Sequence, residues 1–276
     1  MRIGIGLPNT IPGVDRDLLL EWARRADAGP FSSVAVLDRL VYDAVEPFAA
    51  LSAAAALTER VRLATMIAIG PLRNAALLAK LAASVGTLAG GASRLTLGLG
   101  VGARHDDYEA AGVEHAARGP RLSEQLAYLR SGRGEQVHAP CDGVELLVGG
   151  ASGPAFARMA RYADGYAHGG GPPRAFAAAA VRARAAWSDL GRDGRPALWG
   201  QAYFTLTDAD RGAAYLRDYY AFTGGFAERI AAGNLTTARA VKDLIRGYEA
   251  EGCDELVLLP TVADIDDVDR LAEVIA

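Results

Sequence analysis

The sequence predicts a single (β/α)8 barrel over residues 1–276, and three observations support this fold class. Eight short strand-like runs alternate with at least eight longer runs of helical period, as in a parallel sheet whose crossovers are helices. Most of the short runs are apolar throughout, as expected for strands that are covered on both faces. The chain has 276 residues, which is a normal length for one α/β barrel. An open doubly wound sheet is the alternative that the same alternation allows.

The eight expected strands are β-branched or leucine-rich segments. They lie at residues 2–8, 33–38, 61–69, 94–100, 144–149, 164–168, 197–207 and 255–260. The first reads RIGIGLP and the last reads ELVLLP. Because the segments between them are long enough for helical crossovers, parallel pairing is expected.

Helical runs with recognisable ends separate these strands. They lie at residues 15–27, 46–58, 74–88, 121–130, 153–163, 175–190, 208–220, 237–252 and 266–275. The first begins at the acidic Asp15, and the third is followed by Gly90 and Gly91, which is a typical helix C-terminal signal.

Three connections are longer than ordinary turns and are expected to be loops. They lie at residues 101–120, 131–143 and 222–236. Active sites of barrels collect at the carboxyl ends of the strands, so long loops that follow strands are candidates for function.

The charge and composition argue against nucleic-acid and membrane partners. A formal net charge of −4 and a pI near 5.6 provide no basic field for phosphate backbones or acidic membranes. The most apolar windows are shorter than a membrane span. Cys141 and Cys253 lack the CxxC spacing of a zinc or redox site, and we expect both to be buried. The chain opens with a strand pattern and no secretion signal, which predicts a soluble cytoplasmic protein.

The segment LTLGLGVG has glycines at every second position, at Gly98, Gly100 and Gly102. It is not a dinucleotide-binding fingerprint, because the further glycine of that motif is missing and a charged loop is expected to follow. A strand without side chains along one edge can let a flat ring lie against the backbone. The alternative is that the glycines permit tight packing of the barrel.

A better candidate for phosphate binding is the segment LLVGGASGP. Gly149, Gly150, Ala151 and Ser152 lie between an expected strand and a helix that begins near Pro154, so backbone N–H groups would face an anion. A second glycine turn, Gly169-Gly170-Gly171, follows the next strand and would lie beside the first. The alternative is that both are flexible turns.

Other chemistries find little support in the sequence. The four histidines lack metal-ligand spacing, so no metal site is expected, and no GxSxG nucleophile motif is present. Asp38 and Arg39 end the second strand, and Arg104 follows the fourth with Asp106 and Asp107. Asp38, Arg39 and Arg104 are therefore the candidate catalytic residues at the barrel mouth. Their alternative is a set of solvated or paired loop charges.

Six segments together resemble the bacterial-luciferase-like superfamily of flavin-dependent monooxygenases and deazaflavin (coenzyme F420)-dependent oxidoreductases. They are RIGIGLPN, FSSVAVLDR, the long stretch from VRLATMIAIGPLRN to GLGVGARHDDYEAAGV, RGPRLSEQLAYLR, LLVGGASGPAFARMARYADGY and CDELVLLP. The resemblance covers nearly the whole chain and rests on the order and spacing of the segments.

The resemblance implies a (β/α)8 barrel with the cofactor ring in its mouth. It implies a ring-facing strand at Gly98, Gly100 and Gly102, and a phosphate cradle at Gly149, Gly150, Ala151, Ser152, Gly169 and Gly170. The family often has a non-proline cis peptide under the ring. The matching residues are Thr65, Met66 and Ile67, with the cis bond expected at Met66–Ile67, although the family commonly has a smaller residue where Met66 stands.

Two departures from the family bear on the mechanism. Many relatives carry a histidine after the aspartate that ends the second strand, where this chain has Arg39. Relatives that oxidise sugar phosphates carry a glutamate where Ala103 stands, so that activity is not expected. Hydride transfer needs chiefly proximity and orientation, because the cofactor supplies the chemistry. Arg39 and Arg104 are candidates to bind an anionic substrate or a cofactor tail through bidentate contacts.

The resemblance thus predicts an F420-dependent oxidoreductase that moves a hydride to or from a small organic molecule. An FMN-dependent monooxygenase is the alternative within the enzyme class, and a non-catalytic flavin-binding barrel is the alternative from another class. Homodimers are common in the family, so a homodimer is expected by resemblance.

Overall fold

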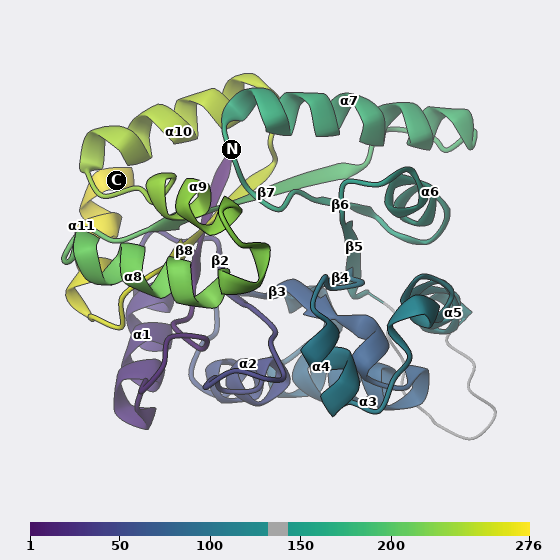
Figure 1. The fold of residues 1–276 in the computed structure, drawn as a ribbon, viewed down its shortest axis with the longest axis horizontal. Coiled ribbons are helices and arrows are strands. Elements are labelled where there is room, and N and C mark those ends of the chain that lie inside the picture. The colour runs from purple at the N-terminus through teal and green to yellow at the C-terminus, as the bar shows by residue number, and fades with distance from the viewer. Residues whose placement is uncertain (132–142) are drawn as a thin grey trace.

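The computed structural model describes residues 1–131 and 143–276 and contains a closed barrel of eight parallel strands (Figure 1). The strands are β1 (Arg2–Gly6), β2 (Ser33–Val36), β3 (Arg62–Ile69), β4 (Leu95–Gly100), β5 (Glu145–Gly149), β6 (Gly165–Ala167), β7 (Ala197–Phe204) and β8 (Glu255–Pro260). Each strand pairs with the next, and β8 pairs with β1 to close the barrel. The predicted barrel is confirmed with all eight strands, and the open sheet is wrong.

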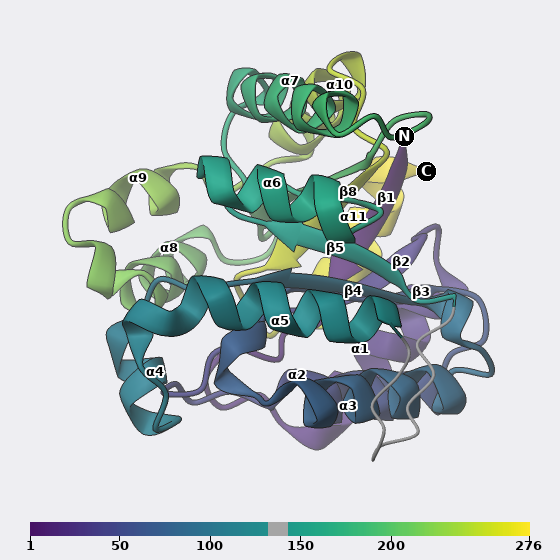
Figure 2. The same cartoon turned by 90° about the vertical axis from the view of Figure 1, so that its right-hand side faces the viewer.

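Eleven α-helices of the described residues surround the barrel (Figures 1 and 2). They are α1 (Arg16–Ala28), α2 (Pro47–Ala55), α3 (Ala75–Leu88), α4 (His105–Ala110), α5 (Arg118–Ser131), α6 (Gly153–Tyr162), α7 (Pro173–Asp189), α8 (Ala209–Tyr219), α9 (Phe226–Ala232), α10 (Ala238–Ala250) and α11 (Asp266–Ile275). Asp15, Asn74, Asp208 and Thr237 cap four of them by accepting a backbone N–H bond from the first turn. None of the described helices is long and apolar enough to cross a membrane.

Two expected loops contain helices. Helix α4 begins at His105 within the 101–120 connection, and α9 lies within the 222–236 connection together with a short 3-10 turn, η4 (Ala221–Thr223). Both helices have fewer than eight residues, which is too short for a 3.6-residue period to be recognised in the sequence. The third expected loop, 131–143, falls almost entirely outside the described residues, as do Cys141 and His138. The predicted burial of Cys253 is confirmed.

The two ends of the barrel differ in chemistry. At the amino ends of the strands, Glu145 accepts hydrogen bonds from Arg62 (2.9 Å) and Thr96 (2.8 Å). The fully buried Glu255 carboxylate nearby forms an ion pair of 3.0 Å with Arg2. These polar groups pair with one another at that end of the barrel. At the other end, α4 follows β4 while α8 and α9 follow β7, and Figure 2 shows all three helices on the same side of the barrel. Connections that follow strands therefore build the opposite, functional end.

Candidate functional site

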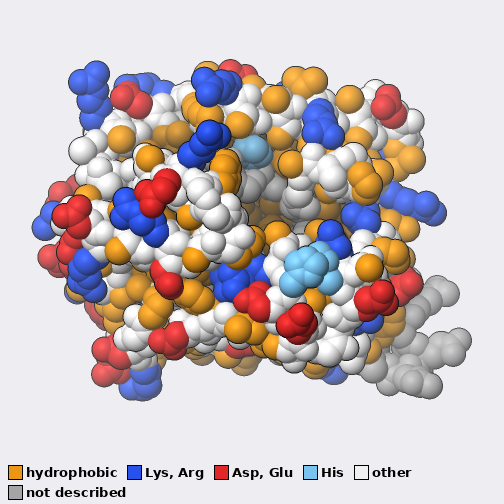
Figure 3. Space-filling model, viewed as in Figure 1, with side chains coloured by type: hydrophobic (Ala, Val, Ile, Leu, Met, Phe, Trp, Pro, Cys, Tyr) orange, Lys and Arg blue, Asp and Glu red, His pale blue; other side chains and the backbone are white. Residues whose placement is uncertain are grey.

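Two cavities adjoin at the carboxyl ends of the strands, where Figure 3 shows a hollow near the centre of the molecular face. The inner cavity, of about 150 Å³, is lined by the ends of β2, β3 and β7, the start of the β4–α4 connection, and the end of α8. The outer cavity, of about 790 Å³, is lined by the β6–α7 connection, β7 and α9. Gln201 and Tyr220 line both. The larger cavity has the volume of a typical small-molecule site.

The floor of the inner cavity comes from β3. The Met66–Ile67 peptide bond is cis, as the resemblance predicted, and the register of β3 against β4 shifts between Thr65 and Ala68. Met66 and Ile67 both line the inner cavity. Thr65 lies behind them, fully buried, and its hydroxyl donates to the Gly98 carbonyl at 2.7 Å. Thus Met66 and Ile67 present their side chains to a ligand, whereas Thr65 holds the strand in place.

The glycines of β4 fit the irregular β3 strand and leave no open face. A Cβ atom at Gly98 would collide with the Thr65 carbonyl, and one at Gly100 would lie 2.7 Å from Ile67 Cδ1. This geometry favours the tight-packing alternative for Gly98 and Gly100, and contact of these two glycines with a cofactor ring stays a prediction. Gly102, with φ of +65°, lines the inner cavity.

The two glycine-rich connections lie side by side, because Gly149 of β5 pairs with Ala167 of β6. Ser152 is the N-cap of α6, and Arg182 from α7 donates to the Ala151 carbonyl at 2.9 Å. Of the predicted phosphate cradle, Gly169 and Gly170 line the outer cavity, whereas Gly149, Gly150, Ala151 and Ser152 do not. A Cβ atom at Gly169 would meet nothing within 4 Å, so its backbone is open to a ligand.

Arg39 is buried, and its guanidinium contacts other groups of the protein. Its guanidinium donates to the carbonyls of Tyr219 and Val41, both at 3.1 Å, and forms an ion pair of 3.4 Å with the fully buried Asp107. The guanidinium also lies 4.8 and 4.9 Å from the ring centroids of Tyr42 and Tyr219. Arg39 therefore ties the loop after β2 to α4 and α8, and its charge is already neutralised.

Asp38 is equally committed to protein contacts. Its carboxylate accepts from the Ile69 amide at 2.8 Å and from Arg73 at 2.7 Å. Burial raises the pKa of Asp38, whereas the Arg73 guanidinium opposes that rise. Three donor groups hold this carboxylate, so Asp38 anchors the end of β3.

Arg104 is paired in the same way. Its guanidinium forms an ion pair and hydrogen bonds with Asp106, and it lies 4.8 Å from the centroid of the Phe222 ring. The three candidate catalytic residues do meet at the mouth, since Asp38, Arg39 and Arg104 all line the inner cavity. Neither Arg39 nor Arg104 is a free cation here, because both face carboxylates, and binding of an anionic substrate by either one stays a prediction.

Two cations that line the outer cavity have no partner among the described residues, and the sequence did not single them out. Arg174, in the first turn of α7, and Arg229, in α9, line the outer cavity and form no ion pair or hydrogen bond through their side chains with any described residue. Arg174 directly follows the GGGPP segment, and this position after a glycine turn could have marked it as a candidate binding residue. Whether an arginine has an ion-pair partner depends on which acids lie nearby in space, and the sequence does not show that.

A group of tyrosines closes the mouth beside these cavities. Tyr220 lines both cavities, Tyr203 lines the outer one, and their hydroxyls are 2.6 Å apart. Burial raises the pKa of both phenols, so both stay protonated at neutral pH. A neutral phenol pair is a hydrogen-bond donor that faces the ligand space.

None of the three described histidines lines the inner or the outer cavity. His168 follows β6, packs 5.7 Å from the Phe176 ring, and has both ring nitrogens buried without a partner among the described residues. Burial lowers its pKa. His105 and His115 stack at 3.7 Å outside the two cavities. Within residues 1–131 and 143–276, no group of three or more His, Cys, Asp or Glu side chains is arranged to hold a metal.

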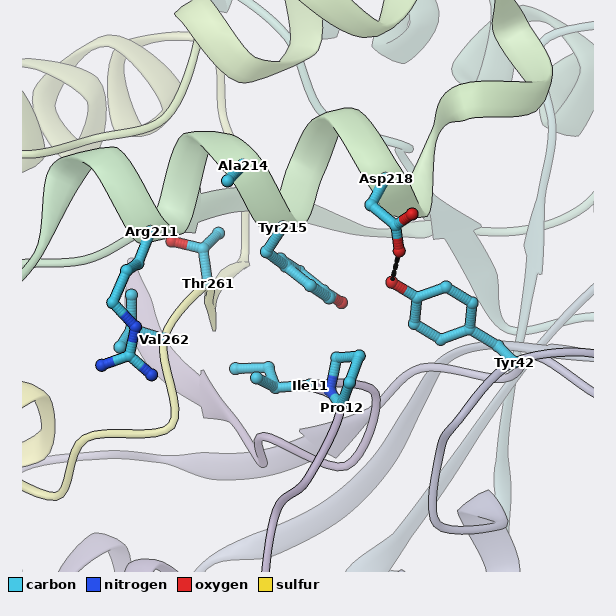
Figure 4. Close-up of a pocket in the computed structure, with 9 residues that line it drawn as sticks. All are labelled: Ile11, Pro12, Tyr42, Arg211, Ala214, Tyr215, Asp218, Thr261 and Val262. Carbon is cyan, nitrogen blue, oxygen red and sulfur yellow. Dashed lines mark hydrogen bonds between the residues drawn. The ribbon is translucent and has the colours of Figure 1, made fainter.

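A third cavity, of about 340 Å³, lies between α8 and the loops that follow β1, β2 and β8 (Figure 4). Tyr42 closes one end with a hydrogen bond of 2.6 Å to Asp218, and Arg211 stands at the opposite end. Tyr215 forms part of the wall between them and contacts Thr10 through its hydroxyl at 2.8 Å. This cavity shares no lining residue with the inner or outer cavity.

Comparison with known proteins gives a family and a set of structural neighbours. The model of the family described as luciferase-like monooxygenase matches residues 1–257. An uncharacterised protein of Mycobacterium tuberculosis is 31% identical over 189 residues. That match covers 55% of this chain and 65% of the relative, so less than two thirds of the relative is spanned.

The fold is similar to that of enzymes with two different cofactors. An F420-dependent secondary alcohol dehydrogenase in complex with an F420-acetone adduct superposes with a TM-score of 0.81 at 18% identity, over 99% of this chain and 97% of that one. The oxygenating constituent of 3,6-diketocamphane monooxygenase from Pseudomonas putida, in complex with FMN, gives a TM-score of 0.72 at 16% identity, over 99% and 95%. At these identities the likeness concerns the fold alone.

Proposed function

The chain belongs to the luciferase-like monooxygenase family, and from this premise we propose that it is an F420-dependent oxidoreductase acting on a small organic substrate. The observation that carries the proposal is the pair of adjoining cavities, whose lining offers no unpaired carboxylate or histidine among the described residues. Asp38 and Asp107 are each held by donors. A site without a free carboxylate or histidine suits a reaction in which the cofactor supplies the chemistry.

The residues present fit such a cofactor. Met66 and Ile67 offer an apolar floor for a flat ring in the inner cavity. The open backbone at Gly169 and the neighbouring Gly170 suit its phosphate group, because N–H groups of glycine turns bind anions. The second glycine connection, Gly149 to Ser152, adjoins them. When bound, F420 supplies a carbon that gives or accepts a hydride.

Tyr220 and Tyr203 would hold the substrate oxygen. The pair carries two hydroxyl protons, and one of them is used between the two oxygens, which are 2.6 Å apart. The second proton has no acceptor among the described residues, and Tyr220 faces both cavities. This O–H group donates to a carbonyl or alkoxide oxygen as negative charge develops on it. The Tyr220 hydroxyl would thus serve as the donor in a chain that has Arg39 where many relatives carry a histidine.

The cofactor assignment is tested by titrating the purified apo-protein with F420 and with FMN while following the fluorescence of each cofactor. We expect tight binding of F420 and weak binding of FMN. Ile67→Glu places a charge on the cavity floor and should weaken F420 binding at least tenfold. Leu190→Glu, a matched change at an exposed position after α7, should leave it unchanged.

Two outcomes would replace the proposal. Tight FMN binding with no measurable F420 binding indicates an FMN-dependent monooxygenase. F420 binding without reduction of any ketone, enone or nitro compound in a broad panel indicates a non-catalytic flavin-binding barrel.

We also propose a cytosolic homodimer, for which light scattering after size exclusion should give twice the 28.9 kDa chain mass.

A further inference from the structure

The outer cavity has an uneven charge. Arg174 and Arg229 line it, and no Asp or Glu among the described residues does. The other lining residues are neutral, and they include the aromatic side chains of Tyr203, Tyr220 and Phe226. Two positive charges at the rim of a neutral, partly apolar cavity create a potential that attracts an anion.

Neighbouring acids do not neutralise these two cations. Glu228, next to Arg229 in the sequence, pairs with Arg217 at 2.9 Å. Arg174 lies in the first turn of α7, where the positive end of the helix dipole makes a cation unfavourable. Arg229 lies in the last turn of α9, where the helix dipole favours a cation, but like Arg174 it forms no ion pair with a described residue. Phe226, which is 54% exposed, adds apolar surface to the same cavity.

We propose that Arg174 and Arg229 bind an anionic group of the substrate, a carboxylate or a phosphate, and so restrict the enzyme to anionic substrates. This inference rests on the proposed function, because the reacting carbon must reach the inner cavity. The two cavities adjoin at Gln201 and Tyr220. A substrate held at its anionic end in the outer cavity therefore extends towards Tyr220 and the Met66–Ile67 floor. Guanidinium groups bind carboxylate and phosphate with two parallel hydrogen bonds.

The alternative ligand for Arg174 and Arg229 is the phosphate or acidic tail of the cofactor. The substrate source is favoured because the glycine backbone at Gly169 and Gly170 already offers N–H groups for a phosphate. Arg174 and Arg229 lie across the outer cavity on separate helices, α7 and α9. The experiment must therefore measure cofactor and substrate binding separately.

Cinnamate and its methyl ester are a matched pair of probes that differ in charge. We would measure their dissociation constants by calorimetry on wild-type protein, both apo and loaded with oxidised F420. Cinnamate should bind at least tenfold more tightly than the ester. Arg174→Ala combined with Arg229→Ala should abolish this preference and leave the affinity for F420 within about twofold. Arg211→Ala removes from the third cavity an exposed cation that forms no ion pair with a described residue, and it should leave the preference intact.

Three results would overturn the inference. The first is a double variant that loses F420 affinity tenfold while the preference for cinnamate persists, since the cations would then serve the cofactor. The second is an equal affinity for cinnamate and ester in wild-type protein. The third is wild-type protein that binds neither cinnamate nor inorganic phosphate at millimolar concentration. If F420 fails to bind but the preference still depends on the two arginines, the anion site stands and the cofactor proposal fails.

Discussion

Two groups of arginines flank the barrel mouth, and they differ in whether an acid accompanies them. Arg39, Arg73 and Arg104 line or border the inner cavity, and each forms an ion pair with an aspartate. Arg174 and Arg229 line the outer cavity, and neither forms an ion pair with a described residue. The paired group uses its charge to hold the loops after β2 and β4. The unpaired group has its charge available for a ligand.

Removal of Asp107 should have the largest effect, because it leaves Arg39 buried without its counter-charge. Asp107 also accepts from the amides of Leu40 (3.1 Å) and Val41 (2.7 Å). We expect Asp107→Ala to lower the free energy of unfolding by about 3–5 kcal/mol in urea denaturation. Asp106→Ala, at a side chain that is 40% exposed, should cost about 1 kcal/mol or less. Equal losses in the two variants would show that the paired group is not a structural anchor.

Tyr220 lies between the two groups, and its loss should mainly affect catalysis. Tyr220→Phe removes the proposed donor and should slow hydride transfer about 100-fold in stopped-flow measurements, the usual contribution of a positioned acid. The dissociation constant of F420 should be unchanged. Tyr203→Phe leaves the Tyr220 hydroxyl in place and should slow the step much less. A larger effect from Tyr203→Phe would assign the donor to Tyr203.

Stability at alkaline pH tests whether the surroundings of Arg39 are shielded from water. Tyr219 packs on Arg39, and burial raises its pKa well above the ordinary value near 10. The unfolded chain therefore loses this proton first, so stability is retained below about pH 10 and declines as the pH rises further. Each such group contributes up to about 1.4 kcal/mol per pH unit. Tyr219→Phe should flatten this decline in urea denaturation at rising pH, and an unchanged slope would contradict the account.

The unpaired arginines should contribute least to stability. Arg174→Ala combined with Arg229→Ala removes no ion pair among the described residues, so the free energy of unfolding should change by about 0.5 kcal/mol or less. The midpoint of urea denaturation measures this directly. A loss as large as that of Asp107→Ala would place these residues in the structural framework and remove the contrast between the two groups.

The fold was readable from the sequence because its strands are short, apolar and regularly separated by helical runs. The positions of Asp38, Arg39 and Arg104 at the mouth were also predictable, since residues that follow barrel strands gather there. Their roles were not, because neutralisation by Asp107 or Arg73 depends on contacts between distant segments. Helices α4 and α9 were missed because they are too short to show a period.

The glycines of β4 illustrate the same limit. Their spacing predicted a strand without side chains, but a sequence does not say what fills the space beside it. In the structure, that space holds the Thr65 carbonyl and the Ile67 side chain. Arg174 and Arg229 are the converse case. Nothing in the local sequence distinguishes an arginine with a partner from one without.

The most direct test of the central claim is anaerobic oxidation of reduced F420 by the purified protein, followed as recovery of the visible absorbance of oxidised F420. The account predicts that an anionic ketone or enoate causes this recovery without oxygen, and that the matched neutral ester does so at least tenfold more slowly. Arg174→Ala combined with Arg229→Ala should bring the two rates together. Turnover that occurs only with reduced FMN and oxygen would contradict the account.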